Sequence, residues 1–334
     1  MRYLFDLGHP AHVHYFKNVI RRLVDNGNDV IIVARDKDVT HELLRAEKLD
    51  FKNRGKGADS IVGKLFYLVF GSLFVWFYGI INKVDVYVGF GSPYAAFSSF
   101  LHMKKSIILD DTENAILGQA FYKRFATKIL SPMSFQRDFG LKHEKFKSFM
   151  ELFYLHPEVF NKEENSNDES KIALLRFVGW NAAHDSGHTG LSFNSKKEII
   201  NKLLVKGYAV HISSEGALPE DFEKYHVVID PAELHNLLSK CSILIGESAT
   251  MASEAAMLGV PAFYFDNEGR GYTNLLEQKY GLVFNYKESD ADVLEALKKL
   301  DEVIEFSSSY WDSKRREILE DNINPNNYLL ERIT

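Results

Sequence analysis

The chain alternates short apolar runs with longer segments in which apolar residues recur every three or four positions. The short runs predict buried strands and the longer segments predict amphipathic helices, so the alternation indicates successive βαβ units. In the first half we expect strands at 3–7, 29–34, 84–89, 106–109 and 129–131. In the second half we expect strands at 171–178, 208–213, 227–229, 243–246, 263–265 and 282–284, with helices near 194–205, 233–240, 291–300 and 308–321. The pattern is typical of an α/β protein with parallel sheets.

Two successive sets of these units predict two Rossmann-like α/β/α domains. The sequence NKEENSNDES at 161–170 is the clearest polar run and the best candidate linker. We therefore predict an N-terminal domain at 1–160 and a C-terminal domain at 171–305. The remaining residues, 306–334, are expected to form a helical tail that packs back toward the N-terminal domain.

The segment 65–81, LFYLVFGSLFVWFYGII, contains 17 apolar, aromatic or small residues without a charge. It is slightly shorter than the ~20 residues that a spanning helix needs, and a strand pattern follows at once. We expect a buried helix of the domain. The alternatives are a spanning helix and a helix that dips one face into the membrane, for which Tyr67, Trp76 and Tyr78 are suited.

Composition narrows the possible partners and location. The 334 residues carry a net charge of −6, which gives no reason to expect a nucleic-acid partner. Cys241 is the single cysteine, so neither a disulfide framework nor a cysteine-based metal site is expected. The chain opens on a strand and lacks the regions of a signal peptide, which predicts a cytoplasmic protein. If segment 65–81 contacts a membrane, we expect that contact at the inner face.

The stretch ILIGESATMASEAAMLGVPAF at 243–263 has the strongest functional pattern. A buried strand ends at Gly246, and a helix then opens beside Ser248, Ala249 and Thr250. The free N–H groups and the positive end of such a helix attract phosphate. Glu254 follows one turn later, where a carboxylate can accept hydrogen bonds from a ribose diol. An ordinary βαβ unit with Ser248 as N-cap explains the same residues without a ligand.

The N-terminal turn GHPAHVHYF carries Gly8, His9, His12 and His14 after the first strand. Ligands of open α/β sheets bind at this carboxyl edge, and histidine is a natural general base near neutral pH. Asp110, Asp111 and Glu113 follow another strand on the same edge, although acids at a helix start also complement the helix dipole.

Known cofactor and metal patterns receive little support from the sequence. Gly8 lacks the partners of a G-x-G-x-x-G fingerprint, so no nicotinamide cofactor is expected. Asp36-Lys37-Asp38 has the D-x-D spelling of some metal-dependent transferases, but a helix start explains its acids. We therefore predict neither a cofactor nor a metal.

Several motifs together resemble a known group of proteins. The segments LFDLGHPAHVHYFKNVI, VGFGSPYAA, LDDTENA and GESATMASEAAMLGVPAFYF lie between residues 4 and 265. They resemble an uncharacterised family of GT-B-like proteins of bacteria and archaea. That family is similar to the peptidoglycan N-acetylglucosamine transferase and to non-hydrolysing UDP-N-acetylglucosamine 2-epimerases. The resemblance implies a GT-B fold, with two Rossmann-like domains facing across a cleft.

The resemblance also implies roles for individual residues. Ser248, Ala249, Thr250 and Met251 would face the diphosphate of a nucleotide sugar, together with Gly246, and Glu254 would hold the ribose. His12 would be the base, with His9, His14, Asp110 or Glu113 as substitutes or orienters. The remaining predicted contacts to the nucleotide sugar are Gly8, Arg176, Trp180, His184, Arg270 and Asn274.

Three functions remain open at this point. The first is a glycosyltransferase that uses a nucleotide sugar, with UDP expected, on a saccharide or lipid-linked acceptor in cell-surface polysaccharide or glycolipid synthesis. The second is a 2-epimerase-like enzyme that isomerises the nucleotide sugar itself, with carboxylates as acid and base. The third is a non-catalytic GT-B-like binding protein.

Overall fold

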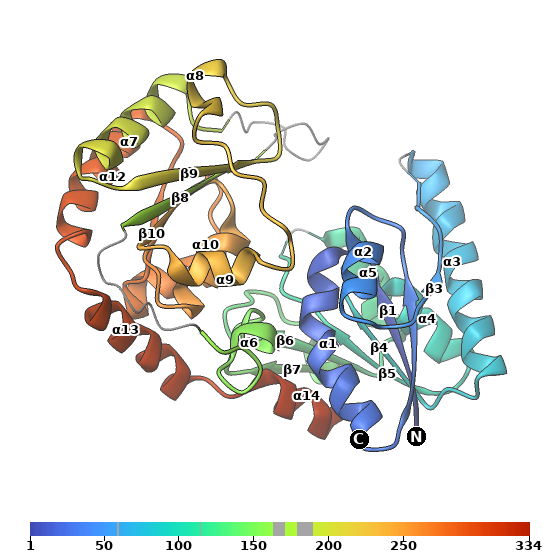
Figure 1. The fold of residues 1–334 in the computed structure, drawn as a ribbon. Coiled ribbons are helices and arrows are strands. Elements are labelled where there is room, and N and C mark those ends of the chain that lie inside the picture. The colour runs from blue at the N-terminus through green and yellow to red at the C-terminus, as the bar shows by residue number, and fades with distance from the viewer. Residues whose placement is uncertain (59, 114, 163–170, 179–189) are drawn as a thin grey trace. The chain divides into compact units, whose positions relative to one another are not determined.

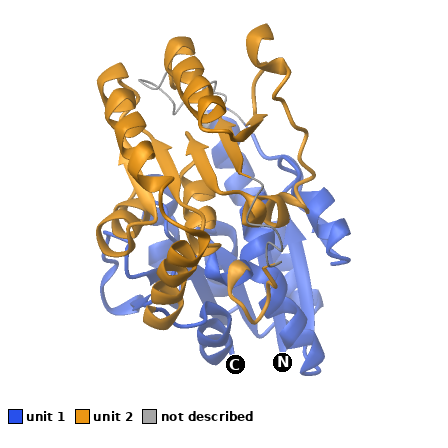
Figure 2. Cartoon of the chain, turned by 60° about the vertical axis from the view of Figure 1, so that its left-hand side comes forward, with its two compact units in different colours: residues 1–154, 322–334 blue, residues 155–321 orange. Residues whose placement is uncertain are grey.

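A computed structural model of the chain describes residues 1–58, 60–113, 115–162, 171–178 and 190–334. These residues form two compact units, each built around one parallel sheet (Figures 1 and 2). Unit 1 comprises Met1–Tyr154 and Asn322–Thr334, and unit 2 comprises Leu155–Asp321. The predicted α/β class with parallel sheets is confirmed.

Unit 1 contains a seven-stranded sheet in the order β3-β2-β1-β4-β5-β6-β7. The strands are β1 (Arg2–Leu7), β2 (Asp29–Ala34), β3 (Lys52–Asn53), β4 (Val86–Phe90), β5 (Lys105–Leu109), β6 (Lys128–Pro132) and β7 (His143–Phe146). The helices are α1 (Pro10–Asp25), α2 (Thr40–Ala46), α3 (Ile61–Ile81), α4 (Pro93–Leu101), α5 (Ile116–Phe125), α6 (Leu152–Leu155) and α14 (Pro325–Ile333). Helix α6 reaches the unit boundary, and a 3₁₀ turn, η1, lies at Gly140–Lys142.

The strand order of unit 1 reverses between β1 and β4. Asp6 pairs with Val33 of β2 on one side and with Gly89 of β4 on the other. Right-handed crossovers therefore place α1 and α2 on one face of the sheet and α3, α4 and α5 on the other. The helix contacts agree, because α1 packs on α2 while α4 packs on both α3 and α5. The chain segments that leave β1 and β4 therefore diverge. Open α/β sheets bind their ligands in the crevice at such a point.

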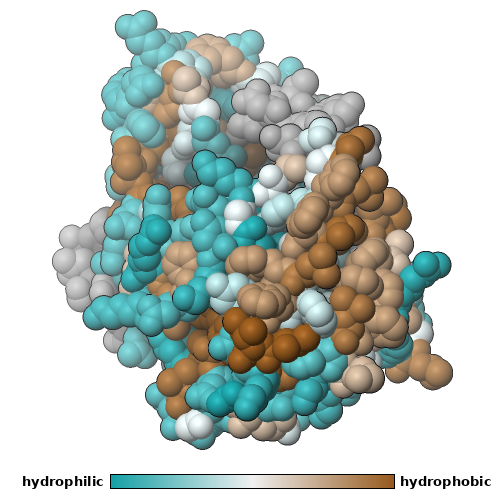
Figure 3. All heavy atoms as spheres, turned by 90° about the vertical axis from the view of Figure 1, so that its right-hand side faces the viewer, coloured by the Kyte–Doolittle hydropathy of each residue, from teal (hydrophilic) through white to brown (hydrophobic). Residues whose placement is uncertain are grey.

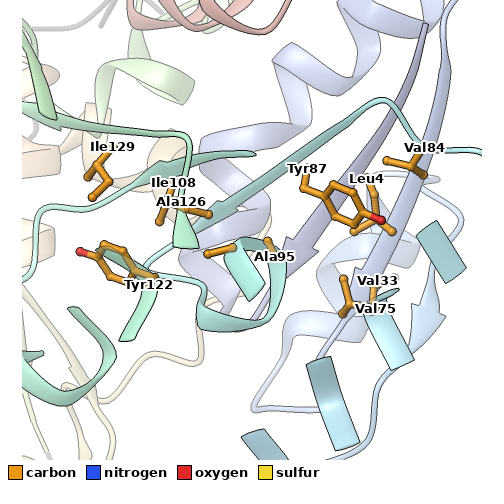
Figure 4. Packing of buried hydrophobic residues seen from close by; sticks show 11 residues of the cluster. Leu4, Val33, Val75, Val84, Tyr87, Ala95, Ile108, Tyr122, Ala126 and Ile129 are labelled. Carbon is orange, nitrogen blue, oxygen red and sulfur yellow. The ribbon is translucent and has the colours of Figure 1, made fainter. Parts of the chain in front are cut away.

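One apolar core of unit 1 lies between this sheet and α3, α4 and α5, and α1 buries apolar side chains on the other face. The core beside α3, α4 and α5 gathers apolar side chains from several strands and helices, including Leu4, Val33, Val75, Val84, Tyr87, Ala95, Ile108, Tyr122, Ala126 and Ile129 (Figure 4). Tyr87 is fully buried, and its hydroxyl lies 2.8 Å from Nδ1 of His102. The core thus holds the sheet rigid beneath the turns that follow its strands.

Helix α3 reaches the core through a narrow seam of small residues. Gly71, Ser72, Val75 and Gly79 are its buried positions after residue 70. A Cβ on Gly79 would lie 1.7 Å from the Tyr87 hydroxyl oxygen, so only glycine allows this approach. The Ser98 hydroxyl of α4 donates to the Ser72 carbonyl at 2.8 Å.

The outer face of α3 contradicts the expectation of a buried helix. Its large apolar side chains are between 41% and 65% exposed and follow helical spacing along its whole length: Val62, Leu65, Phe66, Val69, Phe70, Leu73, Phe77, Ile80 and Ile81. They form a continuous hydrophobic band, which we call the α3 stripe (Figure 3). Hydropathy alone predicted burial, but α3 fully buries only the face that carries Gly71, Ser72, Val75 and Gly79, with Phe74 and Tyr78 partly buried against the core.

Unit 2 contains a five-stranded sheet in the order β12-β11-β10-β8-β9. The strands are β8 (Ile172–Phe177), β9 (Ala209–Ser214), β10 (Ile243–Gly246), β11 (Ala262–Phe265) and β12 (Val283–Tyr286). The helices are α7 (Phe193–Val205), α8 (Glu220–Glu223), α9 (Leu234–Lys240), α10 (Ala249–Met257), α11 (Gly271–Leu275), which continues into a π-helix, η2 (Leu276–Tyr280), α12 (Asp290–Val303) and α13 (Ser308–Asp321). Its strand order reverses between β8 and β10.

Three strand predictions differ from the structure. The predicted strand at 227–229 does not form, and an isolated bridge from Ile212 to His226 stands near it. Val228 is 91% exposed, and Val227 and Ile229 are only partly buried, so the segment has no buried apolar face that would fix it as a strand. The sequence reading missed β3, which has only two residues, and β7, whose HEKF sequence lacks an apolar run.

The C-terminal tail divides between the units. Helix α13 stays in unit 2, where Arg315 donates from Nε to the Met257 carbonyl at 2.8 Å. Helix α14 returns to unit 1, where Arg332 forms an ion pair with Glu144 of β7 at 2.7 Å. Asn326 of α14 also donates to the Phe153 carbonyl at 3.0 Å. The last helix is therefore part of the N-terminal unit.

Candidate functional site

The first candidate crevice lies in unit 2, where β8 and β10 end side by side. Gly246 pairs with Arg176 at the last position of β10. A Cβ on Gly246 would lie 2.2 Å from the Arg176 carbonyl oxygen, so strand packing requires this glycine with or without a ligand. The same carbonyl accepts a hydrogen bond from the Glu247 N–H at 3.0 Å. The crevice thus lies at the switch point of the sheet, where open α/β sheets bind ligands.

Helix α10 points its N-terminus into this edge of the sheet. Ser248 is its N-cap, and the Ser248 hydroxyl accepts from the Met251 N–H at 3.3 Å. Ser248 and Ala249 are partly exposed and Thr250 is exposed, whereas the Met251 side chain is buried. The first N–H groups of the helix therefore face the open edge with the positive end of its dipole. Met251 has no accessible side chain, and its N–H already donates to the Ser248 cap.

Glu254 lies further along α10 and is paired with a histidine from α9. The Glu254 carboxylate and Nε2 of His235 are 3.0 Å apart, and their side chains are 7% and 10% exposed. The His235 ring also meets the Phe160 ring edge-on, with centroids 6.3 Å apart. The sequence reading found Glu254 but missed His235, because 19 residues separate them.

Glu247 is a second carboxylate that the sequence reading missed. Its fully buried carboxylate accepts from the Val178 N–H at 2.8 Å and from the Leu191 N–H at 2.7 Å, through different oxygens. Lys196 lies 3.5 Å from it. Glu247 therefore ties the end of β8 to the segment before α7. An acid directly after the apolar strand Ile243–Gly246 was the available signal.

We expect Glu247→Gln to destabilise unit 2 by about 2–3 kcal/mol. The amide keeps one acceptor oxygen but turns an NH₂ group toward one of the two backbone N–H donors, and the ion pair with Lys196 is lost. Thermal denaturation of the full chain measures the change. Glu215→Gln is the matched control, since this carboxylate is 48% exposed and its loss should cost less than about 1 kcal/mol. Equal losses in the two variants would contradict the role given to Glu247.

The predicted basic contacts of unit 2 lie on the same edge of the sheet. Arg176 donates to the Ser213 hydroxyl at 2.8 Å and to the Glu215 carboxylate at 2.5 Å, so its guanidinium is held by β9 and its extension. Arg270 precedes α11, and Asn274 donates its N–H to the Arg270 carbonyl at 3.0 Å. Burial opposes a charge at Arg270, but Tyr264 and Asp266 outweigh this and raise the pKa of Arg270. The predicted contacts Trp180 and His184 lie outside the described residues.

The second candidate crevice lies in unit 1, at the switch point between β1 and β4. Nδ1 of His9 accepts from the Ala11 N–H at 3.3 Å and caps α1. Nδ1 of His12 accepts from the Gly8 N–H at 3.1 Å. A backbone N–H can only donate, so each ring nitrogen that accepts is unprotonated and Nε2 carries the proton of the neutral ring.

This hydrogen bond changes the chemistry expected of His12. Withdrawal from water, His9 and the cations Lys37 and Arg54 hold the pKa of His12 well below its ordinary value. A neutral ring with its proton on Nε2 donates a hydrogen bond and cannot accept a proton at that atom. This arrangement favours a donor role for His12 at Nε2 over the base role expected from the sequence, and the part that His12 plays in catalysis stays a prediction.

A buried ion pair beneath these histidines was not predicted. Nε of Arg54 lies 3.0 Å from the Asp6 carboxylate, and both side chains are almost fully buried. The Ser92 hydroxyl donates to Asp6 at 2.5 Å and also caps α4. The Arg54 guanidinium stacks 3.9 Å from the centre of the Tyr94 ring and donates to the Tyr67 hydroxyl at 3.1 Å. Tyr67 belongs to α3, so the stripe-bearing helix also supports the crevice.

The acids at the end of β5 have different roles. Asp110 is 1% exposed and accepts from the Thr112 N–H, the Gln119 amide and the Tyr122 hydroxyl. Its hydrogen bonds fix it within the fold, which argues against the predicted catalytic role. Burial and the neighbouring Asp110 raise the pKa of Asp111 to about 7, although part of its side chain reaches solvent. Glu113 lies close enough to Asp111 to contribute to that shift. Asp111 is thus the carboxyl group best suited to take up a proton near neutral pH.

The structure does not bring His14 to His12. Two residues apart on α1, the side chains point about 160° apart around the helix, on nearly opposite sides. The His12 ring lies 4.9 Å from the Phe90 ring, whereas the His14 ring lies 5.2 Å from the Tyr154 ring, measured between centroids. Within the described part of the chain, no group of three or more His, Cys, Asp or Glu side chains has a metal-binding arrangement.

Comparison with known proteins relates this fold to nucleotide-sugar enzymes. The family model described as Protein of unknown function (DUF354) matches residues 1–73. No curated protein matches the sequence. The chain is similar to the UDP-GlcNAc 2-epimerase from Neisseria meningitidis bound to UDP-GlcNAc, with 14% identity, 99% of each chain covered and a TM-score of 0.66.

Two glycosyltransferase structures match over the whole chain. Acinetobacter baumannii MurG has 14% identity, covers 100% of this chain and 99% of its own, and gives a TM-score of 0.62. The spinosyn rhamnosyltransferase SpnG, complexed with thymidine diphosphate, has 12% identity, covers 100% of each chain and gives a TM-score of 0.65. These matches confirm the predicted relationship to GT-B transferases and 2-epimerases at the level of fold.

Proposed function

We propose that the chain is a glycosyltransferase that binds a nucleotide sugar, with UDP as its nucleotide, in the crevice of unit 2. The observation that carries the proposal is the joint position of the α10 N-terminus and Glu254 at the switch point of the sheet. The helix end suits a diphosphate, and a carboxylate one turn later suits a ribose diol. The similar structures bound to UDP-GlcNAc and thymidine diphosphate support this class of ligand.

The crevice of unit 1 holds side chains whose chemistry suits an acceptor hydroxyl and an oxygen that gains negative charge. Asp111 is the group that we assign as base for the acceptor hydroxyl, because its pKa of about 7 leaves a useful fraction ionised at neutral pH. Nε2–H of His12 is a fixed donor for an oxygen that gains negative charge, and His9 presents a second ring N–H beside it. Departure of the nucleoside diphosphate is stabilised by the N-terminus of α10.

We further propose that the acceptor is a lipid-linked or cell-surface saccharide and that α3 rests on the inner face of the cytoplasmic membrane. Among the described residues, Val62–Ile81 alone has the length and composition to cross a bilayer, and 22% of its most apolar window is buried. Its other face packs on α4, and β3 and β4 on either side of it belong to one sheet. Lipid can therefore cover the α3 stripe but cannot surround the helix.

The charges near the α3 stripe favour an anionic membrane over a protein partner. Lys64 and Lys83 are exposed near the two ends of α3, and Lys104 and Lys105 are exposed after α4. No acidic residue lies between Ser60 and Asp85. An apolar face with lysines at its margins is the pattern of a helix that lies in the membrane–water interface.

The 2-epimerase reading stays a second candidate because of Asp111. A carboxyl group with a pKa of about 7 can also exchange a proton with a sugar carbon. Conversion of the UDP-sugar to an isomer in the absence of an acceptor would favour the epimerase. Release of UDP only when a membrane extract supplies the acceptor would favour the transferase. Nucleotide binding without either reaction would indicate a binding protein.

The proposed nucleotide site is tested by titration calorimetry with UDP, after a thermal-shift screen of nucleotide sugars. We expect wild-type protein to bind UDP and Glu254→Ala to bind it about 10- to 100-fold more weakly, because hydrogen bonds to a charged group are lost. Glu277→Ala, at a carboxylate in the π-helix that accepts from Asn285, is a control for loss of an acid in the same unit. Absence of UDP binding by the wild type would overturn the proposal.

A further inference from the structure

Helix α3 is held unevenly along its length. From Gly71 onward one face of the helix is buried against the core, whereas none of the side chains described from Val62 to Phe70 is more than partly buried. Within this first half of α3, Tyr67 is the described residue whose side chain hydrogen-bonds outside the helix. A short helical segment with few tertiary contacts is only marginally stable in water. The stability of the first half of α3 therefore depends on Tyr67 and on the cover of the α3 stripe.

Tyr67 joins the first half of α3 to Arg54, which follows β3. The Tyr67 hydroxyl accepts from Nη1 of Arg54 at 3.1 Å. The same hydroxyl lies 3.2 Å from the Arg54 carbonyl oxygen and 3.3 Å from that of Gly55, to one of which it donates. On its other side the Arg54 guanidinium is anchored by Asp6, at 3.0 Å from Nε. One hydroxyl thus ties α3 to both the side chain and the backbone of the segment after β3.

Arg54 in turn lies against the turn that carries His12. A Cβ on Gly8 would lie 4.0 Å from Nη2 of Arg54 and 3.7 Å from Cε1 of His12, so the guanidinium packs beside this turn. The Gly8 N–H donates to Nδ1 of His12 at 3.1 Å. Packed side chains and hydrogen bonds of this kind carry energetic coupling between sites. A continuous set of contacts therefore runs from the first half of α3 through Arg54 to His12.

We infer that Tyr67 is a positioning residue through which lipid contact at the α3 stripe orders the Gly8–His12 turn in the crevice of unit 1. The inference rests on the membrane contact of the proposed function and adds to it a regulation of the crevice. Lipid that covers Phe66 and Phe70 stabilises the first half of α3, because it removes their apolar surface from water. The hydrogen bonds of Tyr67 are then made for more of the time, which fixes Arg54 and the turn beside it. The crevice is fully ordered only where the proposed acceptor lies.

The experiment measures amide hydrogen exchange by mass spectrometry on the full chain, free and fully bound to vesicles of equal parts phosphatidylcholine and phosphatidylglycerol. For the wild type we expect the vesicles to slow exchange at 62–70. We also expect them to slow it at 5–12 and 52–58 by about fivefold, the factor that one hydrogen bond of ordinary net strength represents. Tyr67→Phe keeps the ring and its lipid contact, so exchange at 62–70 should still slow. Its response at 5–12 and 52–58 should fall below about twofold, because the hydroxyl is gone.

Two further variants test the path on either side of Tyr67. Tyr78→Phe makes the same change about three turns later on α3, where the ring packs against Phe74, and should keep the wild-type response. Phe66→Asn combined with Phe70→Asn removes lipid contact from the first half of α3 only. This double variant should lose the response at 5–12 and 52–58, while exchange of the free protein stays as in the wild type.

The response to vesicles separates positioning from a purely structural role. A merely structural hydrogen bond, or direct shielding by lipid, would leave the vesicle response of Tyr67→Phe equal to that of the wild type, and this result would overturn the inference alone. Slowing that is confined to 62–70 in the wild type would refute it as well. Absence of vesicle binding by the wild type would overturn the membrane contact of the proposed function, and the inference with it.

Discussion

Replacing His12 by alanine is expected to lower the rate of UDP release from the UDP-sugar by about 100-fold. The variant loses the Nε2–H donor that the Gly8 N–H fixes through Nδ1. His12→Gln should retain much of the rate, because a glutamine amide also donates a hydrogen bond while it cannot serve as a base. The measurement is steady-state turnover with the donor sugar that the thermal-shift screen identifies.

The pH profile distinguishes a donor from a base. Burial, His9 and the nearby cations hold the pKa of His12 well below its ordinary value, so we expect a neutral ring that contributes no inflection near neutral pH. A base must be deprotonated, so kcat/KM should rise with pH through the pKa of Asp111, about 7. That inflection should persist in His12→Gln and disappear in Asp111→Asn. If it disappears instead in His12→Gln, His12 is the base and the donor role is wrong.

His14→Asn is the matched comparison for the His12 variants. His14 lies on the same helix, so damage to α1 would affect both positions, but its ring lies against Tyr154 rather than against Phe90. We expect a loss of less than about threefold, the size of effect that surface or packing changes of well under 1 kcal/mol produce. An equal loss in His14→Asn and His12→Ala would indicate damage to the helix.

The second large effect is expected on membrane binding. Changing Phe66, Phe70 and Phe77 together to asparagine should lower the affinity for vesicles of equal parts phosphatidylcholine and phosphatidylglycerol by about 100-fold. Each ring is 55–65% exposed in the fold, and covering that much of a phenylalanine contributes roughly 1 kcal/mol. Co-sedimentation with the vesicles measures the change. Because these rings already face outward, the thermal stability should change little.

Charge and position provide the controls for the membrane prediction. Vesicles of pure phosphatidylcholine should bind the wild type more weakly, because Lys64, Lys83, Lys104 and Lys105 lose their anionic partners. Asparagine at Leu141 and Val228, which are fully or almost fully exposed outside the α3 stripe, should leave binding unchanged. Unchanged sedimentation of the triple variant would show that something other than lipid covers the α3 stripe. The same conclusion would follow if light scattering finds a stable dimer of the wild type and only monomers of the triple variant.

The sequence predicted the parts of each crevice that are contiguous in the chain. Residues 243–263 contain a strand, a turn and a helix, so hydrophobic period and capping chemistry sufficed to place Ser248 at the helix start and Glu254 one turn later. The same reasoning placed His9 and His12 in a turn after β1. Local patterns determine local structure, and parallel strands bring their carboxyl ends to a common edge.

Partners that are distant in the chain were beyond these patterns. Arg54 reaches Asp6 across 48 positions, and Glu247 receives hydrogen bonds from segments 69 and 56 residues away. Such pairs depend on strand order, and no spacing rule along the chain records it. The same limitation concealed His235 beside Glu254, although each residue lies in an element whose existence was predicted.

Tertiary packing also decided which face of a helix meets the core and which atom of a side chain is free to react. The composition of α3 determined a long apolar helix, but only its packing on the core, with Gly79 against Tyr87, leaves Phe66, Phe70 and Phe77 facing outward. The sequence determined that a histidine stands at position 12. Only the fold, which directs the Gly8 N–H at its Nδ1, decided that the proton of the neutral ring lies on Nε2.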